Sequence, residues 1–171
     1  SGKFTEAEEL SRRLLPDTTR ALSATHLETL HARANFAKIL YQLKKHDEAE
    51  KEYRQVLAIN HHVRGPEDAF TLQIHKELAI VLFAQERKAE ATEELRTMLT
   101  VQDRSLGAEH PDSLYTCTFL ALYLKAQNKP QEALPYAQRA LAGQLKVLGK
   151  DHPHTQLSQR QVNELTKVET K

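Results

Sequence analysis

The stretch LGAEHPDSL, residues 106–114, is nearly repeated as LGKDHPHTQ, residues 148–156. Corresponding positions in the two stretches are 42 residues apart, as the glycines Gly107 and Gly149 are. One further step of 42 towards the amino end reaches Gly65. The period therefore extends beyond the two stretches and predicts a structural unit that is copied along the chain.

Composition indicates one ordinary globular domain. The chain has 171 residues, of which 40% are hydrophobic and 27% charged, and its 5 glycines and 6 prolines leave little room for linkers. Lys and Arg number 24 against 23 Asp and Glu, so no net basic field points to nucleic acid. A single cysteine cannot form an internal disulfide, and no apolar run is long enough for a membrane span. We expect a cytoplasmic protein with no cofactor and no membrane contact.

Within each period the apolar residues form two runs with helical spacing, separated by a short polar turn. In the first run Leu30, Ala37 and Leu40 share one stripe, and the second run carries Ala49 and Tyr53. Two such runs predict a helical hairpin. The helices are predicted at residues 4–14, 27–43, 47–63, 69–85, 89–105, 111–127, 131–147 and 153–169.

Glycine and proline mark the boundaries between copies. Gly107 suits the left-handed position just after a helix, and Pro111 suits the first turn of the next helix, where no amide donor is needed. For the copies without that proline, Asp68 is a predicted N-cap, and Thr25 with Glu28 is a candidate capping box. In the first helix, Pro16 is expected to kink or end the helix.

Alanines recur at fixed places in both helices of the hairpin. A methyl group fits where two helices cross closely, whereas a larger side chain forces the backbones apart. We therefore expect the first alanine of each copy to face the second, in the pairs Ala37 with Ala49, Ala79 with Ala91, and Ala121 with Ala133.

One hairpin cannot cover its own apolar faces, so neighbouring hairpins must stack. The predicted fold is all-α, a right-handed α–α superhelix (solenoid) of antiparallel helical hairpins with about eight helices. We expect residues 1–171 to form a single domain. It divides into a half repeat with only its second helix (1–24), three full repeats (25–66, 67–108 and 109–150) and a final or capping helix (151–171).

The chain resembles the tetratricopeptide repeat (TPR) family, in the 42-residue variety found in kinesin light chains. The segments that carry the likeness are NFAKIL with HDEAEKEY, ELAIVL with KAEATEEL, and FLALYL with PQEALPYA, joined by the two stretches quoted at the start. The resemblance covers essentially the whole chain. It implies a non-catalytic module that binds a peptide or protein partner in a concave groove lined by the first helix of each hairpin.

The resemblance also implies which positions face this groove. The second, fifth, ninth and twelfth residues of each first helix are expected there, and they are richer in basic and aromatic residues than the chain as a whole. A partner that is acidic and carries apolar anchors would suit them. The predicted peptide-binding residues are His31, Lys38, Tyr41, Lys76, Phe83, Tyr115, Lys125 and Arg160.

Other kinds of site are weaker interpretations. Adjacent His61 and His62 diverge by about 100° on a helix, and His152 has a capping role in the repeat, so we predict no metal site. Cys117 at a helix-packing position is read as a small hydrophobe, and we predict no catalytic residue. Recognition of RNA, which other helical repeats perform, stays a less favoured alternative because acidic residues flank the basic pair Lys44 and Lys45.

The two ends of the chain differ in character. At the amino end Phe4, Leu10 and Leu14 lack a preceding helix to cover them, so we expect the domain to be cut from a longer protein and self-association to be an alternative function. At the carboxyl end the last helix keeps an apolar stripe but has Asn163 and Thr166 where earlier copies are apolar. We expect it to act as a cap.

The alanine register can be tested at one position. Ala79→Leu overpacks the predicted crossing and should lower the free energy of unfolding by about 1 to 3 kcal/mol, measured by chemical denaturation. Ala84→Leu, outside the predicted seam, is the matched control and should have little effect. Equal losses in the two variants would show that the register is wrong.

Overall fold

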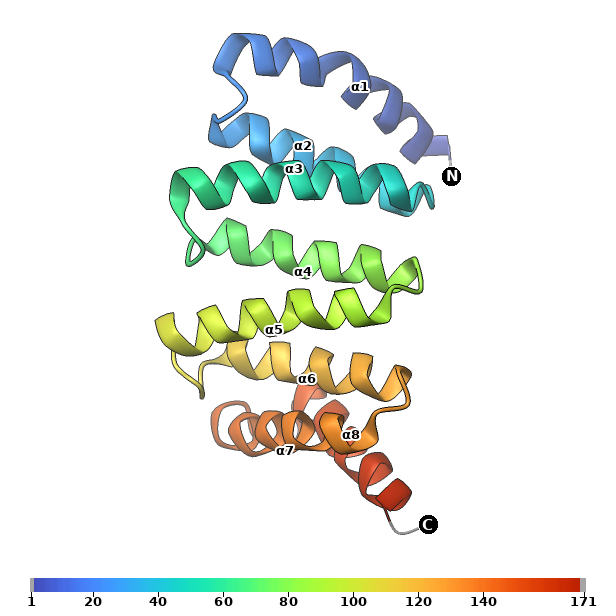
Figure 1. The fold of residues 1–171 in the computed structure, drawn as a ribbon, viewed down its shortest axis with the longest axis vertical. Coiled ribbons are helices and arrows are strands. Elements are labelled where there is room, and N and C mark those ends of the chain that lie inside the picture. The colour runs from blue at the N-terminus through green and yellow to red at the C-terminus, as the bar shows by residue number, and fades with distance from the viewer. Residues whose placement is uncertain (1, 170–171) are drawn as a thin grey trace. The chain divides into compact units, whose positions relative to one another are not determined.

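The computed structural model describes residues 2–169, and their side chains as far as residue 167. In that part of the chain all regular secondary structure is α-helical (Figure 1). Its eight helices are α1 (Gly2–Leu22), α2 (Leu27–Gln42), α3 (His46–Arg64), α4 (Ala69–Ala84), α5 (Lys88–Ser105), α6 (Pro111–Ala126), α7 (Pro130–Val147) and α8 (Pro153–Glu169). The predicted fold class, all-α with about eight helices, is confirmed.

Contacts within the chain define two compact units, unit 1 from residues 1–86 and unit 2 from residues 87–171. In unit 1 each helix packs against the next, α1 on α2, α2 on α3 and α3 on α4. In unit 2 the helices pack in the same sequential order, and α8 contacts α6 as well as α7. Each unit is therefore a layered stack of helices (Figure 1).

The helix boundaries follow the 42-residue period closely. From α2 to α8 every helix begins and ends within one residue of its predicted bounds. The first helix is the exception, because α1 continues through Pro16 to Leu22 and the expected end at the proline is wrong. Beyond the proline, the Thr18 and Thr19 hydroxyls donate to the backbone carbonyls of Leu14 and Leu15 at 3.0 and 2.7 Å. The helix therefore continues although a proline inside it costs about 3 kcal/mol.

We call the first helix of each hairpin an A helix; the A helices are α2, α4, α6 and α8. Their N-caps all lie at the same position of the 42-residue repeat. Asp68 is the N-cap of α4 as predicted, and its carboxylate accepts the amides of Phe70 and Thr71 at 3.0 and 3.2 Å. The capping box at Thr25 is a wrong prediction. Since α2 begins at Leu27, the cap falls on His26, 42 residues before Asp68.

The turn between repeats requires a backbone conformation with positive φ. Gly107 has a φ of 98°, and its carbonyl accepts a hydrogen bond from the Ser113 hydroxyl at 2.9 Å. Thr71 makes the same bond to the Gly65 carbonyl at 2.9 Å. In the first copy this turn position is held by Ser23, with a φ of 82°. The structure thus places an L-residue in a region that disfavours side chains.

The small residues at the helix crossings are all buried. Ala37 and Ala49 in unit 1 have no exposed surface, and in unit 2 Ala121 and Ala133 are 1% and 0% exposed. The last two belong to one core cluster, with Leu165 of α8 also in it. The predicted close crossing of α6 with α7 is therefore confirmed.

The inner face of α8 is more polar than the sequence suggested. Thr118 of α6 shares a hydrogen bond of 3.1 Å with Ser158, and its backbone carbonyl accepts the Gln161 amide at 3.2 Å. Asn163 and Thr166 are exposed, because they point away from this contact. The last helix therefore covers the stack with a polar network on one side and a polar surface on the other.

The strained turn predicts a stabilising substitution. Ser23→Gly relieves the left-handed penalty and should raise the free energy of unfolding by up to about 1 kcal/mol, after the added flexibility of the unfolded chain is subtracted. Gly107→Ser, at the equivalent position two repeats on, should lower it by a similar amount. Denaturant titration of both variants measures this, and a loss of stability in Ser23→Gly would contradict it.

Candidate peptide-binding face

The predicted groove residues of unit 1 lie on α2 and α4. The His31 ring packs on the ring of Phe70 at a centroid distance of 4.1 Å, which joins the two A helices. Near the other end of α2, Tyr41 stacks on His46, the first residue of α3, at 5.4 Å. These rings form a partly apolar surface that extends along α2.

Basic groups accompany these aromatic side chains. Lys38 on α2 is exposed and Lys76 on α4 is half-buried, and neither forms an ion pair with any described residue. Phe83, on α4, is also half-buried. We call the surface of His31, Lys38, Tyr41, Lys76 and Phe83 the unit 1 face. Its two lysines remain free to meet a negatively charged ligand.

In unit 2 the predicted groove residues are less free. Lys125 of α6 is paired with Glu164 of α8. The hydrogen bond from Lys125, helped by the charges of Lys167 and Arg160, lowers the pKa of Glu164. Tyr115 contacts His154 edge to face, with ring centroids 4.7 Å apart. An internal carboxylate therefore offsets part of the positive charge on this side of unit 2.

Thr118 is the fifth residue of its repeat's first helix when Leu114 is counted as the first, so it was expected in the groove, but it is buried instead. It is 3% exposed and is the centre of the polar network under α8. Its hydroxyl also accepts a hydrogen bond from Gln144 of α7 at 3.1 Å. The position turns inward because α8 packs directly on α6, so a small polar side chain there serves the core rather than a ligand.

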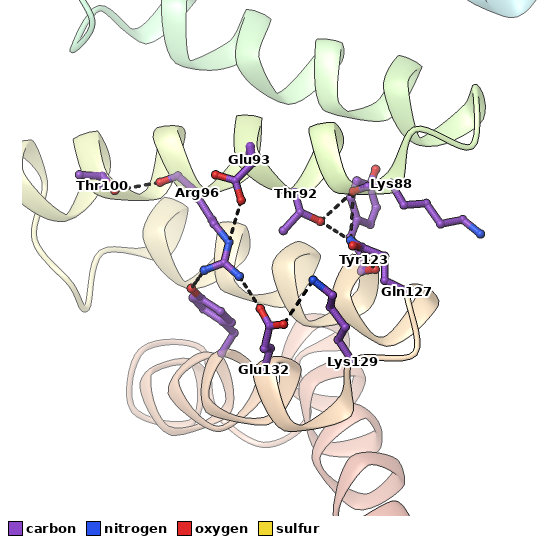
Figure 2. Close-up of polar contacts among 10 residues, drawn as sticks. Lys88, Thr92, Glu93, Arg96, Thr100, Tyr123, Gln127, Lys129 and Glu132 are labelled. Carbon is purple, nitrogen blue, oxygen red and sulfur yellow. Dashed lines mark hydrogen bonds and ion pairs between the residues drawn. The ribbon is translucent and has the colours of Figure 1, made fainter.

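The B helices, the second helix of each hairpin and α1, show a different pattern of charge. In unit 2, Arg96 of α5 donates to Glu132 of α7 at 2.9 Å and to the Tyr136 hydroxyl at 3.0 Å (Figure 2). In unit 1, Arg12 of α1 pairs with Glu48 of α3. Both pairs occupy the same places in the repeat, since Arg12 and Arg96 are two periods apart, as are the two glutamates. These two arginines are matched by carboxylates from the B helix that follows each of them.

Figure 2 also shows an amide that joins a hairpin turn to the preceding B helix. The Gln127 side chain donates to the Thr92 hydroxyl at 2.6 Å and to the Lys88 carbonyl at 3.0 Å. Beside it, Lys129 lies 3.3 Å from Glu132. The side chains of Gln127 and Lys129 are thus bound to other groups of unit 2.

A carboxylate near the start of the chain is held between two cations. Glu8, 6% exposed, accepts from Lys45 at 2.6 Å and from Arg12 at 2.8 Å. The hydrogen bond from Lys45, with that from Arg12, outweighs burial and lowers the pKa of Glu8. The cluster ties α1 to the α2–α3 turn and to α3, which is a structural use of these charges.

A surface depression in unit 1 lies between α1 and α2 and contains three arginines, Arg12, Arg20 and Arg33. Such a cluster would be a candidate anion site if the charges were free. Arg20 pairs with Asp17 at 3.0 Å and Arg33 with Glu52 at 2.6 Å, while Arg12 is matched as described above. The depression therefore has no spare cation to offer.

Catalytic or metal chemistry finds no support among the described residues. They include no group of three or more His, Cys, Asp or Glu side chains placed to hold a metal ion. Burial raises the pKa of Cys117 to about 11, so its thiol stays protonated and weakly nucleophilic. In the part of the chain that is described, no helix is long and apolar enough to cross a membrane.

Several neighbours of the predicted residues were missed from the sequence. Phe70 and His46 were not among the predicted positions because they lie at helix starts, outside the four register positions used. The contact of Tyr115 with His154 was missed for the same reason. A search for aromatic residues at the first positions of neighbouring helices would have found all three.

The geometry defines an all-α repeat protein built of helical hairpins. Residues 1–60 and 68–146 match the model of the tetratricopeptide repeat, and the chain belongs to this family. It is thus a protein-interaction module of repeated helical hairpins. No curated protein matches the chain closely enough to count as a relative.

Solved structures agree with this assignment. A Podosopora anserina protein described as a kinesin light chain with nearly identical TPR-like repeats is 27% identical, with a TM-score of 0.86 over 99% of this chain and 80% of that one. BtubC (BKLC) from P. vanneervenii is 20% identical, with a TM-score of 0.77 over 89% of this chain and 60% of that one. The N-terminal domain of stress-induced protein-1 from C. elegans is 16% identical, with a TM-score of 0.61 over 81% and 95%. The last two show the fold alone.

Proposed function

We propose that the unit 1 face binds an acidic peptide or protein segment that carries apolar anchors. The observation that carries this proposal is the contrast between two kinds of cation. Lys38 and Lys76 on the A helices of unit 1 are unpaired, whereas Arg12 and Arg96 on the B helices pair with Glu48 and Glu132. The module itself does no chemistry in this proposal. Tyr115 and Arg160 of unit 2 are proposed as further contacts.

The two kinds of group on the face have separate tasks. The lysines attract carboxylates and set the approach of the ligand, a contribution that salt weakens. The rings of His31, Tyr41 and Phe83 offer aromatic area at little cost in conformational entropy, and such groups supply most of the binding energy in protein interfaces. An acidic segment lacking apolar side chains should therefore bind weakly.

Charge reversal tests the proposed site. Lys38→Glu combined with Lys76→Glu should weaken binding of a labelled peptide of glutamates with leucine and tryptophan anchors by about tenfold or more, since two attractions become repulsions. Fluorescence anisotropy measures the affinity. Circular dichroism should show unchanged melting, because neither lysine has a partner in the fold.

The matched control is Lys3→Glu with Lys51→Glu, which makes the same change in net charge on exposed residues of α1 and α3. This variant should bind the peptide as the parent does. If the control loses as much affinity as the double variant, only net charge matters and the unit 1 face is not the site.

Self-association through α1 is a second candidate function, favoured by an exposed apolar side. Phe4 is 44% exposed, and Leu10 and Leu14 are each 46% exposed, all on one side of the helix. In an antiparallel pair of α1 helices from two copies, Phe4 would lie opposite Leu14, and Glu6 opposite Arg13. Glu6 and Arg13 are exposed and without a partner among the described residues, so this pairing is complementary in charge.

Dilution experiments separate this candidate from a monomer. Light scattering should show a dimer at high concentration that dissociates on dilution, and Leu14→Glu should abolish it. Leu145→Glu changes an equally exposed leucine in unit 2, 44% exposed, and should leave the dimer intact. A parent chain that stays monomeric at every concentration removes this function.

A further inference from the structure

Histidine is the cap at three of the four A helices. His26, His110 and His152 lie at intervals that are multiples of 42 residues, and Asp68 holds the remaining place. In each case the ring Nδ1 accepts the amide of the residue two positions on, at 3.3 Å for His26 and 3.2 Å for His110 and His152. A bond repeated three times at one register position is a property of the repeat.

This bond exists only while the imidazole is uncharged. Nδ1 accepts a hydrogen bond in the neutral ring but carries a proton and becomes a donor in the imidazolium. The amide it faced then has no acceptor, and a positive charge sits at the positive end of the helix dipole. Histidine changes charge between about pH 5 and pH 8, whereas a carboxylate such as that of Asp68 stays ionised.

The residue two positions after each cap decides how much protonation matters. Glu28 follows His26, and Asp112 follows His110, with its carboxylate 3.8 Å from the ring nitrogen. The Asp112 carboxylate can stabilise an imidazolium at His110 in place of the lost bond. His152 is followed instead by His154, whose ring centroid lies 5.3 Å away. At this cap a second histidine replaces the compensating acid.

Other groups around the cap do not supply that acid. From α6, the neutral Tyr115 contacts His154 at 4.7 Å. In the α7–α8 turn, the exposed residues Lys150 and Asp151 precede His152. The Asp151 backbone carbonyl accepts a hydrogen bond from the Gln156 side chain at 3.4 Å. From α7, Lys146 is paired with Glu109. Among the described residues, no carboxylate therefore forms an ion pair with His152 or His154.

We propose that the His152–His154 cap is a pH-sensitive clasp that holds the start of α8 on α6 and releases it as the pH falls from about 7.5 to 5.5. The closed form needs Nδ1 of His152 without a proton, and the open form does not. Protons therefore bind preferentially to the open form, and its population rises with acidity.

Opening would expose a specific part of unit 2. The first turns of α8 bring Thr155 and Ser158 into the interior, and Ser158 shares its hydrogen bond with Thr118. Tyr115 would lose its contact with His154. Acid would thus uncover the α6 surface next to the proposed contact Tyr115. The helix α4, which carries Lys76 and Phe83 of the unit 1 face, keeps its carboxylate cap at Asp68.

Amide exchange of the whole chain, followed by nuclear magnetic resonance, tests the clasp. We expect the protection factors of α8 amides at residues 156–160 to fall by about tenfold relative to those of α6 between about pH 7.5 and 5.5, the size of a lost cap with an adverse dipole interaction. His152→Asp copies the natural cap of α4 and should remove this fall. His154→Glu restores the acid found in the other copies and should reduce it.

His110→Asp is the matched control, because it changes a cap of the same kind on α6 and should leave the fall at α8 as large as in the parent. Circular dichroism at about pH 7.5 checks that each variant is folded. The proposal is overturned if, in the parent, the protection of α8 amides relative to α6 amides is the same at both pH values. It is also overturned if this protection falls as much in His152→Asp as it does in the parent.

Discussion

The two helices of a hairpin cross at small residues. Ala37 and Ala49 are fully buried, as are Ala121 and Ala133 to within 1%, and at so close a crossing a side chain larger than a methyl group would force the helices apart. This crossing fixes how far apart the helices lie and which side of each faces outward. The register then determines every other assignment, from the caps to the charged pairs, because each recurs with the same 42-residue step.

The two sides of the helical layers use charge differently. On the B helices, cations meet carboxylates from the next layer, as Arg96 meets Glu132 and Arg12 meets Glu48. Such exposed pairs each contribute little to stability, but each carboxylate offsets the charge of its arginine. On the A helices of unit 1, Lys38 and Lys76 keep their charges unmatched. A surface that leaves charge unpaired is better suited to recognition than to holding the fold together.

Most of the fold followed from the period, since apolar spacing, alanines and turn residues all indicated the same helices. Three features did not. The helix α1 continues through Pro16, although local preference disfavours a proline there. The cap of α2 is His26 rather than the predicted Thr25, and it was overlooked because histidine is a weak capping signal in a sequence. Thr118 is buried rather than exposed because α8 packs directly on α6. The sequence register predicted which residues belong to the binding face. It could not predict the contacts between their rings, because these depend on the direction in which each side chain points.

The burial of Cys117 makes unit 2 observable by itself. It is the single cysteine of the chain, it has no exposed surface, and its thiol is held in the protonated form. A thiol reagent can react only when the α6 environment opens, so the modification rate counts openings of unit 2 and is blind to those of unit 1. The protein thus carries an internal reporter that distinguishes local opening of one half from unfolding of the whole.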